Sequence, residues 1–344
     1  MRRALLAFLG NEDAAELVAG VAGRFGLRAR PCKSGLSLFI GDALPDCVMP
    51  DGAVVLGDIF SLTGATCQGA ADGWGSFIAF TRDESGWRID RAPLTGLPLY
   101  WTRWRGGILC ASRLEPFAEL IDRLSIDWEF VSQALVYSNL RTERTGIGGL
   151  AELLSGMRLS WDGKEPWTTM LWSPWEHVGK GRSTGIAQLA PVLERRLIDA
   201  VRCWGRSRPD IMLELSGGLD SSIVAAALTA GGVDYAAVNF VTPGADGDER
   251  HYAKAVAAHC GISLSEAALD PADIDLVAAP AIVGLRPGAY AVLRGIDHAF
   301  ERIVKGRDVS VFGGIGGGKI FSFPGFASAP FYSPAPFRFA CPAP

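Results

Sequence analysis

Residues 213–226 read LELSGGLDSSIVAA and bring two glycines, three serines and one aspartate into a short stretch between apolar runs. Glycines let a bound group approach the backbone closely, because no side chain stands in the way. Backbone amides there, with the hydroxyls of Ser216, Ser221 and Ser222, suit an anion such as phosphate. Asp220 fits beside an anion if a cation lies between them, as Mg²⁺ does on a nucleotide. The stretch therefore predicts a site for the phosphates of ATP.

The neighbouring residues predict the elements that position this loop. IMLEL (211–215) is expected to be a strand, residues 216–220 the turn and Ser221 the start of a helix. Beyond residue 186 strand and helix patterns alternate: YAAVNFV follows as a strand and DERHYAKAVAAHCG as a helix. Such alternation predicts a parallel sheet covered by helices on both faces. The second part of the chain is thus expected to be a doubly wound α/β domain.

The first part of the chain has a different pattern. MRRALLAFLG is expected to form the first strand, and LSLFI, AVVLGDIF, GSFIAFTRD, WRIDRAP, LPLYWTRW and GILCAS further strands between Gly, Pro and Asp turns. This spacing is typical of packed antiparallel sheets. One helix, residues 11–26, is expected with Asn11 as N-cap and Gly26 at its exit. We therefore expect an α+β domain over 1–178, an ATP-binding domain over 179–323 and a Pro/Ala/Phe-rich, disordered tail over 324–344.

Composition limits the classes of function. The chain has 344 residues, 49% hydrophobic, with a net charge of −4, and a calculated pI near 5.7. An acidic balance argues against nucleic acid or an anionic membrane as partner. The seven cysteines are scattered without a CxxC pair, which indicates neither a disulfide framework nor a zinc site. We expect a cytoplasmic protein.

The string SGGLDSS lacks the lysine of a Walker loop. It resembles the pyrophosphate loop of the N-type ATP pyrophosphatases, among them asparagine synthetase, although a plain tight connection has the same local geometry. In asparagine synthetase a glutaminase domain comes first, with a cysteine nucleophile exposed by removal of the initiator methionine. Here the second residue is Arg2. A glutaminase-like domain without its nucleophile is similar to β-lactam synthetase and to the macrolactam synthetases, or cyclases, of lasso peptide biosynthesis.

Several phrases favour the lasso cyclases within this family. They are GWGSFIAF from Gly73, LPLYW from Leu97, LRTERTGIGGLAELLSGMRL from Leu140, LWSPWE from Leu171 and GDERHYAKAVA from Gly247. The resemblance implies a two-step reaction with ATP and Mg²⁺. A peptide side-chain carboxylate is adenylated, and the peptide's own amine then displaces AMP to close an isopeptide ring. It also implies a lasso precursor core as substrate and a leader peptidase as partner.

The resemblance also implies roles for particular residues. Asp220 is the expected catalytic residue and Mg²⁺ ligand, and Asp248 with Glu249 form a candidate acidic pair, a position that the helix dipole explains equally well. The expected ATP and pyrophosphate contacts are Leu215, Ser216, Gly217, Gly218, Leu219, Asp220, Ser221, Ser222, Val238, Asn239, Phe240, Gly314, Ile315, Gly316, Gly317 and Lys319.

Two departures from the family leave alternatives open. In GGIGGGK, from Gly313, the family's second metal-binding aspartate is replaced by Gly318. The tail from residue 324 lacks the family's later helical pattern, so a C-terminal truncation is expected. One alternative is asparagine synthetase proper. The other is a catalytically incompetent relative that still binds nucleotide or peptide.

Overall fold

The computed structural model describes residues 3–61, 67–137, 140–178, 185–241, 244, 248–277, 284–287 and 290–314. Within them the chain divides into two compact units. Unit 1 comprises the residues up to Thr184 together with Val277–Ala291, and unit 2 comprises Gly185–Leu276 and the residues from Val292 onward. The expected division placed residues 179–323 in one continuous domain. The structure differs, because a short segment from within that stretch packs into unit 1.

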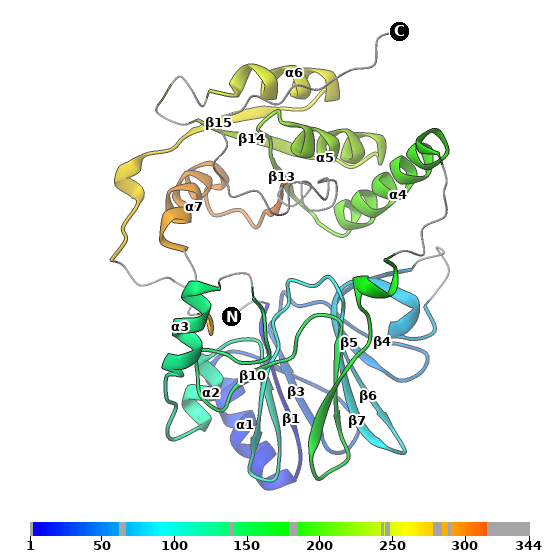
Figure 1. Ribbon diagram of the computed structural model, residues 1–344, viewed down its shortest axis with the longest axis vertical. Coiled ribbons are helices and arrows are strands. Elements are labelled where there is room, and N and C mark those ends of the chain that lie inside the picture. Colours follow the sequence, from blue (N-terminus) through cyan, green and yellow to red (C-terminus); the bar gives the residue numbers. More distant parts are fainter. Residues whose placement is uncertain are drawn as a thin grey trace. The chain divides into compact units, whose positions relative to one another are not determined.

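Unit 1 is built from two antiparallel six-stranded sheets (Figure 1). One has the strand order β10-β8-β9-β1-β3-β2 and the other β12-β11-β7-β6-β5-β4. The strands are β1 (Leu5–Leu9), β2 (Arg28–Arg30), β3 (Leu36–Ile40), β4 (Asp46–Val48), β5 (Val54–Ser61), β6 (Gly73–Asp83), β7 (Gly86–Arg91), β8 (Tyr100–Trp104), β9 (Gly107–Ala111), β10 (Ala151–Glu152), β11 (Met157–Trp161) and β12 (Pro166–Met170).

Alternating side chains of β1 fill two separate cores. Along β1, Leu5, Ala7 and Leu9 pack against residues of both sheets, whereas Leu6 and Phe8 pack against helical residues on the other face. All five residues of β1 are buried for this reason. The expectation of packed antiparallel sheets in the first part of the chain is therefore confirmed.

The helices of unit 1 are α1 (Glu12–Arg24), α2 (Glu115–Leu120) and α3 (Trp128–Val136), with single 3₁₀ turns at Ala70–Asp72 and Pro174–Glu176. Asn11 is the N-cap of α1, and its side chain accepts a hydrogen bond from the amide of Ala14 at 2.9 Å. Gly26, just after the helix, has a φ of +66°. Both predictions for the ends of this helix are confirmed.

A buried ion network ties the segment around Arg286 to the rest of unit 1. The Glu152 side chain is 1% exposed and forms ion pairs with Arg91 at 2.8 Å, Arg141 at 3.2 Å and Arg286 at 2.8 Å. The adjacent Leu285 is buried among the helical side chains. Burial raises the pKa of Glu152, but hydrogen bonds from Arg91 and Arg286 and the charge of Arg141 outweigh it, so that the pKa lies below its usual value.

Unit 2 contains a four-stranded parallel sheet in the order β15-β14-β13-β16. Its strands are β13 (Ile211–Glu214), β14 (Ala236–Val241), β15 (Leu264–Ala268) and β16 (Ser310–Phe312). Its helices are α4 (Ile186–Arg206), α5 (Leu219–Ala230), α6 (Arg250–Cys260) and α7 (Tyr290–Val304), with a 3₁₀ turn at Pro271–Asp273.

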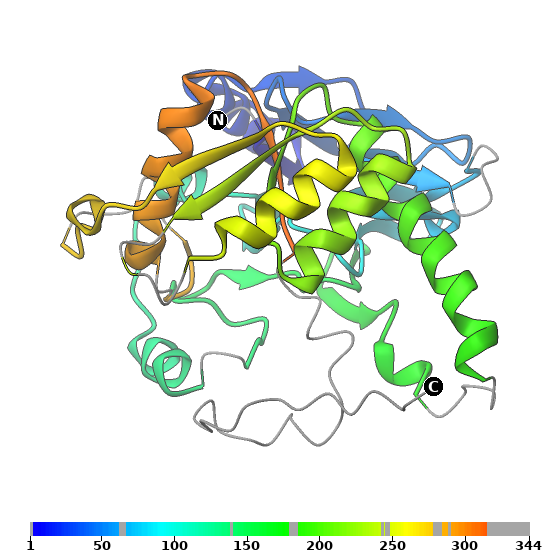
Figure 2. The same ribbon diagram turned by 90° about the horizontal axis from the view of Figure 1, so that it is seen from above.

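Helices lie on both faces of this sheet (Figure 1). Leu213 of β13 packs with residues of α4, α5 and α6, and Figure 2 shows these three helices following one another on that face. Met212, the neighbouring residue, packs with Ala299 and Phe300 of α7 on the other face. The expectation of a parallel sheet with helices on both faces is confirmed. Among the described residues, no helix has the length and apolar character needed to cross a membrane.

Candidate functional site

The order of the strands marks one place where a ligand can enter the sheet of unit 2. From β13 the chain first adds β14 and β15 on one side, and later adds β16 on the other side of β13. Helix α5, which follows β13, and helix α7, which precedes β16, lie on opposite faces of the sheet, which marks a crevice at the carboxyl ends of these two strands. The loop after β13 is SGGLDSS, so the predicted phosphate loop lies at this crevice.

Glycine is required in the loop because the backbone approaches a neighbouring helix. Gly217 has a φ of +85°, and a Cβ atom there would lie 2.5 Å from the amide nitrogen of Ala253 in α6. Neither the conformation nor the space suits another residue type. The SGG sequence thus positions the turn against the first part of α6.

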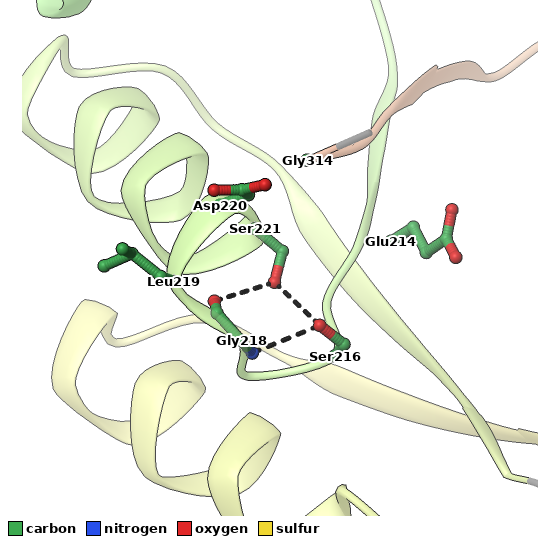
Figure 3. Close-up of a pocket in the computed structure, with 7 residues that line it drawn as sticks. All are labelled: Glu214, Ser216, Gly218, Leu219, Asp220, Ser221 and Gly314. Carbon is green, nitrogen blue, oxygen red and sulfur yellow. Dashed lines mark hydrogen bonds between the residues drawn. The ribbon is translucent and has the colours of Figure 1, made fainter. Parts of the chain in front are cut away.

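Hydroxyl groups hold the loop in shape. The amide of Gly218 donates to Ser216 Oγ at 3.1 Å, and this Oγ lies 3.1 Å from Ser221 Oγ (Figure 3). Ser221 and Ser222 both donate to the carbonyl oxygen of Gly218, at 3.2 and 2.8 Å. The sequence predicted these hydroxyls as phosphate donors. In the structure they are used within the loop, so it is already organised before a ligand binds.

Helix α5 begins two residues earlier than predicted, at Leu219 rather than Ser221. Gly218 is its N-cap, without a side chain to cap the first turn. The predicted turn residues Leu219 and Asp220 therefore belong to the helix, because Gly218 has the extended conformation of an N-cap. The first amides of α5 have no partner within the helix and can bind an anion.

A cavity of about 370 Å³ opens at this helix end. That size is in the range of small-molecule sites. Its lining comes from the β13–α5 connection and from the end of β16 (Figure 3). The lining residues are Glu214, Ser216, Gly218, Leu219, Asp220, Ser221 and Gly314. The structure thus brings Gly314, 94 positions after Asp220 in the sequence, into the same cavity.

Three of the expected ATP contacts, Val238, Asn239 and Phe240, belong to β14. Val238 is fully buried, and Asn239 is 3% exposed. The Asn239 side-chain amide donates to the carbonyl oxygen of Leu215 at 2.9 Å, and the Leu215 amide donates to the carbonyl oxygen of Val238 at 2.8 Å. Phe240 faces Phe300 of α7 at 6.4 Å between ring centroids. None of these residues lines the cavity, and Asn239 acts by holding the strand end from which the loop starts.

The candidate acidic pair lies just before α6. Asp248 binds Arg250 through two side-chain hydrogen bonds of 2.8 and 2.6 Å. These bonds, with one from the Arg250 amide, lower the pKa of Asp248 to about 2. Glu249 is the exposed N-cap residue of α6. The Asp248 carboxylate is thus already neutralised by a neighbour, and neither residue lines the cavity.

Sequence reasoning missed Glu214, the last residue of β13. It lines the cavity, and burial raises the pKa of its carboxyl group. Among the residues that the structure describes, no hydrogen-bond donor or cation pairs with this carboxylate. The signal that points to it in the sequence is a carboxylate at the end of an otherwise apolar strand, immediately before the glycine loop.

Carboxylates supply the oxygen ligands that Mg²⁺ prefers, and the cavity has two of them, Asp220 and Glu214. Within the described ranges no group of three or more His, Cys, Asp or Glu side chains gathers into a metal site. A nucleotide-bound ion needs few protein ligands, because phosphate and water complete its coordination. Asp220 therefore fits the metal of a bound nucleotide. The predicted residues Ile315, Gly316, Gly317, Gly318 and Lys319 lie outside the described residues.

Comparison with known proteins adds one informative result. A search of curated proteins found no match. Among solved structures, 25 chains match; one, described as the structure of the allosteric regulatory enzyme of purine biosynthesis, is 9% identical with a TM-score of 0.31, over 90% of this chain and 89% of that chain. Residues 192–334, less than half of the chain but including the SGGLDSS loop and Gly314, match the family model described as "Asparagine synthase".

Proposed function

We propose that the chain forms an amide bond by activating a carboxylate with ATP. The observation that carries this proposal is the cavity where the loop after β13 and Gly314 after β16 meet at the open N-terminus of α5. The asparagine synthase match over residues 192–334 supports the same chemistry. The free amides of α5 bind phosphate, and the glycine loop lets it approach the backbone.

Asp220 is the residue that would hold Mg²⁺ on the nucleotide phosphates. The described lining contains no Lys or Arg side chain, so the phosphate charge is left for a metal ion and backbone amides to neutralise. When bound, the ion stabilises the negative charge that grows on the phosphates as the carboxylate is activated. The preorganised loop supports this role because its hydroxyls do not need to rearrange.

We further propose a peptide as the substrate, with closure of a macrolactam ring as in lasso peptide biosynthesis. Free aspartate carries a second carboxylate, which needs a cationic partner. The described lining offers none. A peptide that presents a single side-chain carboxylate avoids this cost. Its precursor would be cleaved by a leader peptidase, and we propose the cytoplasm as the compartment of the reaction.

ATP–pyrophosphate exchange tests this function. The full chain is assayed with Mg²⁺ and a synthetic peptide that has a free N-terminal amine and one side-chain carboxylate, in parallel with free aspartate. We expect exchange with the peptide and a loss of at least about tenfold in Asp220→Asn. The matched control is Asp234→Asn, an exposed carboxylate just before β14, at the amino ends of the parallel strands and so at the opposite end from the cavity.

The outcomes separate three functions. Exchange with the peptide supports the macrolactam proposal. Exchange with aspartate alone would replace it with asparagine synthesis. ATP binding without exchange for either substrate would contradict amide formation and assign the chain a nucleotide-binding function.

A further inference from the structure

Glu214 is a carboxylate that has no hydrogen-bond or ion-pair partner among the described residues, and it lies in a cavity that we assign to an anion. It lines the same cavity as the phosphate loop. A negative side chain beside phosphate is unfavourable unless a cation lies near it. The proposed reaction brings two cations to this place, the metal ion on the nucleotide and the protonated amine of the second substrate group.

The side chain of Glu214 lies on a different face of the sheet from Asp220, the proposed Mg²⁺ ligand. Glu214 follows the alternation of β13, so its side chain is on the same face as Met212, which packs with α7. Asp220 belongs to α5, which covers the other face. Figure 3 shows the two carboxyl groups on opposite sides of Gly314, with that of Glu214 extended away from the loop. One ion chelated by both carboxylates does not match this arrangement.

The space next to Glu214 is kept open by glycine. A Cβ atom at Gly313 would lie 3.6 Å from Glu214 Oε2, an ordinary contact distance. Burial disfavours the charged form of Glu214 and raises its pKa. A cation beside this carboxylate favours the charged form again, through Coulomb attraction and a charge-assisted hydrogen bond. An ammonium group provides that cation on the face away from Asp220.

We propose that Glu214 binds the acceptor amine as an ammonium ion and takes the proton that this amine must lose before it attacks the activated carboxylate. The proposal rests on the amide-forming function proposed above. The phosphates then lie on the α5 face of the sheet edge and the amine on the α7 face, with the reacting carbonyl carbon between them. The end of β13 thus supplies Glu214 for the attack of the amine, and the loop supplies the phosphate site for activation of the carboxylate.

The step balances as follows. The ammonium ion gives one proton to the Glu214 carboxylate and becomes a neutral amine. Its nitrogen then forms the C–N bond to the acyl carbon, and the C–O bond to AMP breaks, with the electron pair leaving on the AMP phosphate. The nitrogen loses its second proton to water. Glu214 returns its proton to water before the next turnover.

Glu214→Gln tests the proposal, because glutamine keeps the shape and removes the charge. Two reactions are compared in the full chain with ATP and Mg²⁺. The first is hydroxamate formation from an N-acetylated peptide with hydroxylamine, which is neutral at pH 7 and needs no ammonium site. The second is ring closure of the same peptide with a free N-terminal amine, followed by mass spectrometry.

We expect Glu214→Gln to keep hydroxamate formation within about twofold and to lose ring closure by about 10- to 100-fold, the range for one charge-assisted hydrogen bond. Glu214→Asp, which keeps the charge, should recover part of the ring closure. Asp234→Asn is the control for a charge change elsewhere in unit 2. Melting temperatures identify any variant that fails to fold. If Glu214→Gln does not fold, the test uses Glu214→Asp, whose displaced carboxylate should raise the KM for the free-amine peptide.

Two results would overturn the role of Glu214: ring closure within twofold of the wild type in Glu214→Gln, or an equal loss in both reactions. The second result would assign Glu214 to carboxylate activation or to structure. A wild-type chain that forms no hydroxamate would instead reject the amide-forming function itself, and the amine site with it.

Discussion

Gly314, two residues after β16, approaches the first turn of α5 so closely that a Cβ atom there would lie 2.5 Å from the amide nitrogen of Ser221. This approach joins two segments that are far apart in the sequence and completes the wall of the cavity. The atoms that would be contacted are backbone atoms, which cannot rotate away. Glycine at this position is therefore a requirement of the site.

We predict that Gly314→Ala displaces the end of β16 from α5 and weakens the fold by about 1–3 kcal/mol, the usual cost of overpacking. Gly313→Ala is a matched control, because its new Cβ would have only an ordinary contact, 3.6 Å from Glu214 Oε2. Urea unfolding of both variants measures the difference. Equal stabilities would contradict the close approach of Gly314.

Two adjacent glycines of the phosphate loop should respond differently to alanine. Gly217→Ala combines a left-handed φ of +85° with a Cβ atom 2.5 Å from the Ala253 amide nitrogen, and we expect a loss of about 2–4 kcal/mol. Gly218 has a φ of −69°, so Gly218→Ala should cost less than about 1 kcal/mol. Thermal unfolding of the two variants measures both losses of stability. A larger loss in Gly218→Ala than in Gly217→Ala would show that the loop has another conformation.

Asn239 should be needed for the position of the loop although it does not line the cavity. Asn239→Leu has a similar volume but leaves the buried carbonyl of Leu215 without its side-chain donor. We expect a loss of about 1–3 kcal/mol in the free energy of unfolding, and weaker ATP binding by calorimetry. Unchanged stability would mean that the Leu215 carbonyl has another partner.

The buried Glu152 network should make the chain sensitive to acid. The pKa of Glu152 is lower in the folded chain than its usual value of 4.5, so its contribution is complete above pH 4.5 and is lost as the pH falls through the lowered value. We therefore expect the free energy of unfolding to decrease as the pH is lowered below 4.5.

Glu152→Gln tests this expectation. It should cost about 3–5 kcal/mol at pH 7, because it leaves the buried Arg91 without its counter-ion, and it should flatten the acid dependence. The control is Glu165→Gln, whose ion pair with Arg103 is at the surface and should matter little. A variant that keeps the full acid dependence would assign that dependence to other carboxylates.

The sequence was sufficient to predict the long, regular elements. The strand LSLFI (36–40) and the helix after Asn11 were predicted with nearly the observed bounds, because their patterns have a clear period and their caps are local. The short strands β2 and β16, of three residues each, have too few residues to show a period. β2 forms by pairing with the next strand, β3, and β16 by pairing with the distant strand β13.

The same division applies to the site. The glycines and hydroxyls of SGGLDSS identified the loop, since their function depends on local backbone geometry. The use of Ser221 and Ser222 within the loop, and the position of Glu214 beside Gly313, depend on how the helix starts and where β16 lies. These features result from tertiary packing, which a local sequence pattern does not predict.

The ion pair between Arg286 and Glu152, 134 positions apart, also has a consequence for synthesis on the ribosome. Unit 1 receives Leu285 and Arg286 only after β13, β14 and β15 of unit 2 have been made. Until then Glu152 has Arg91 and Arg141 as partners but lacks Arg286. Unit 1 therefore completes its folding late, and a fragment that ends at Thr184, the chain's first crossing between the units, would lack the segment that completes unit 1.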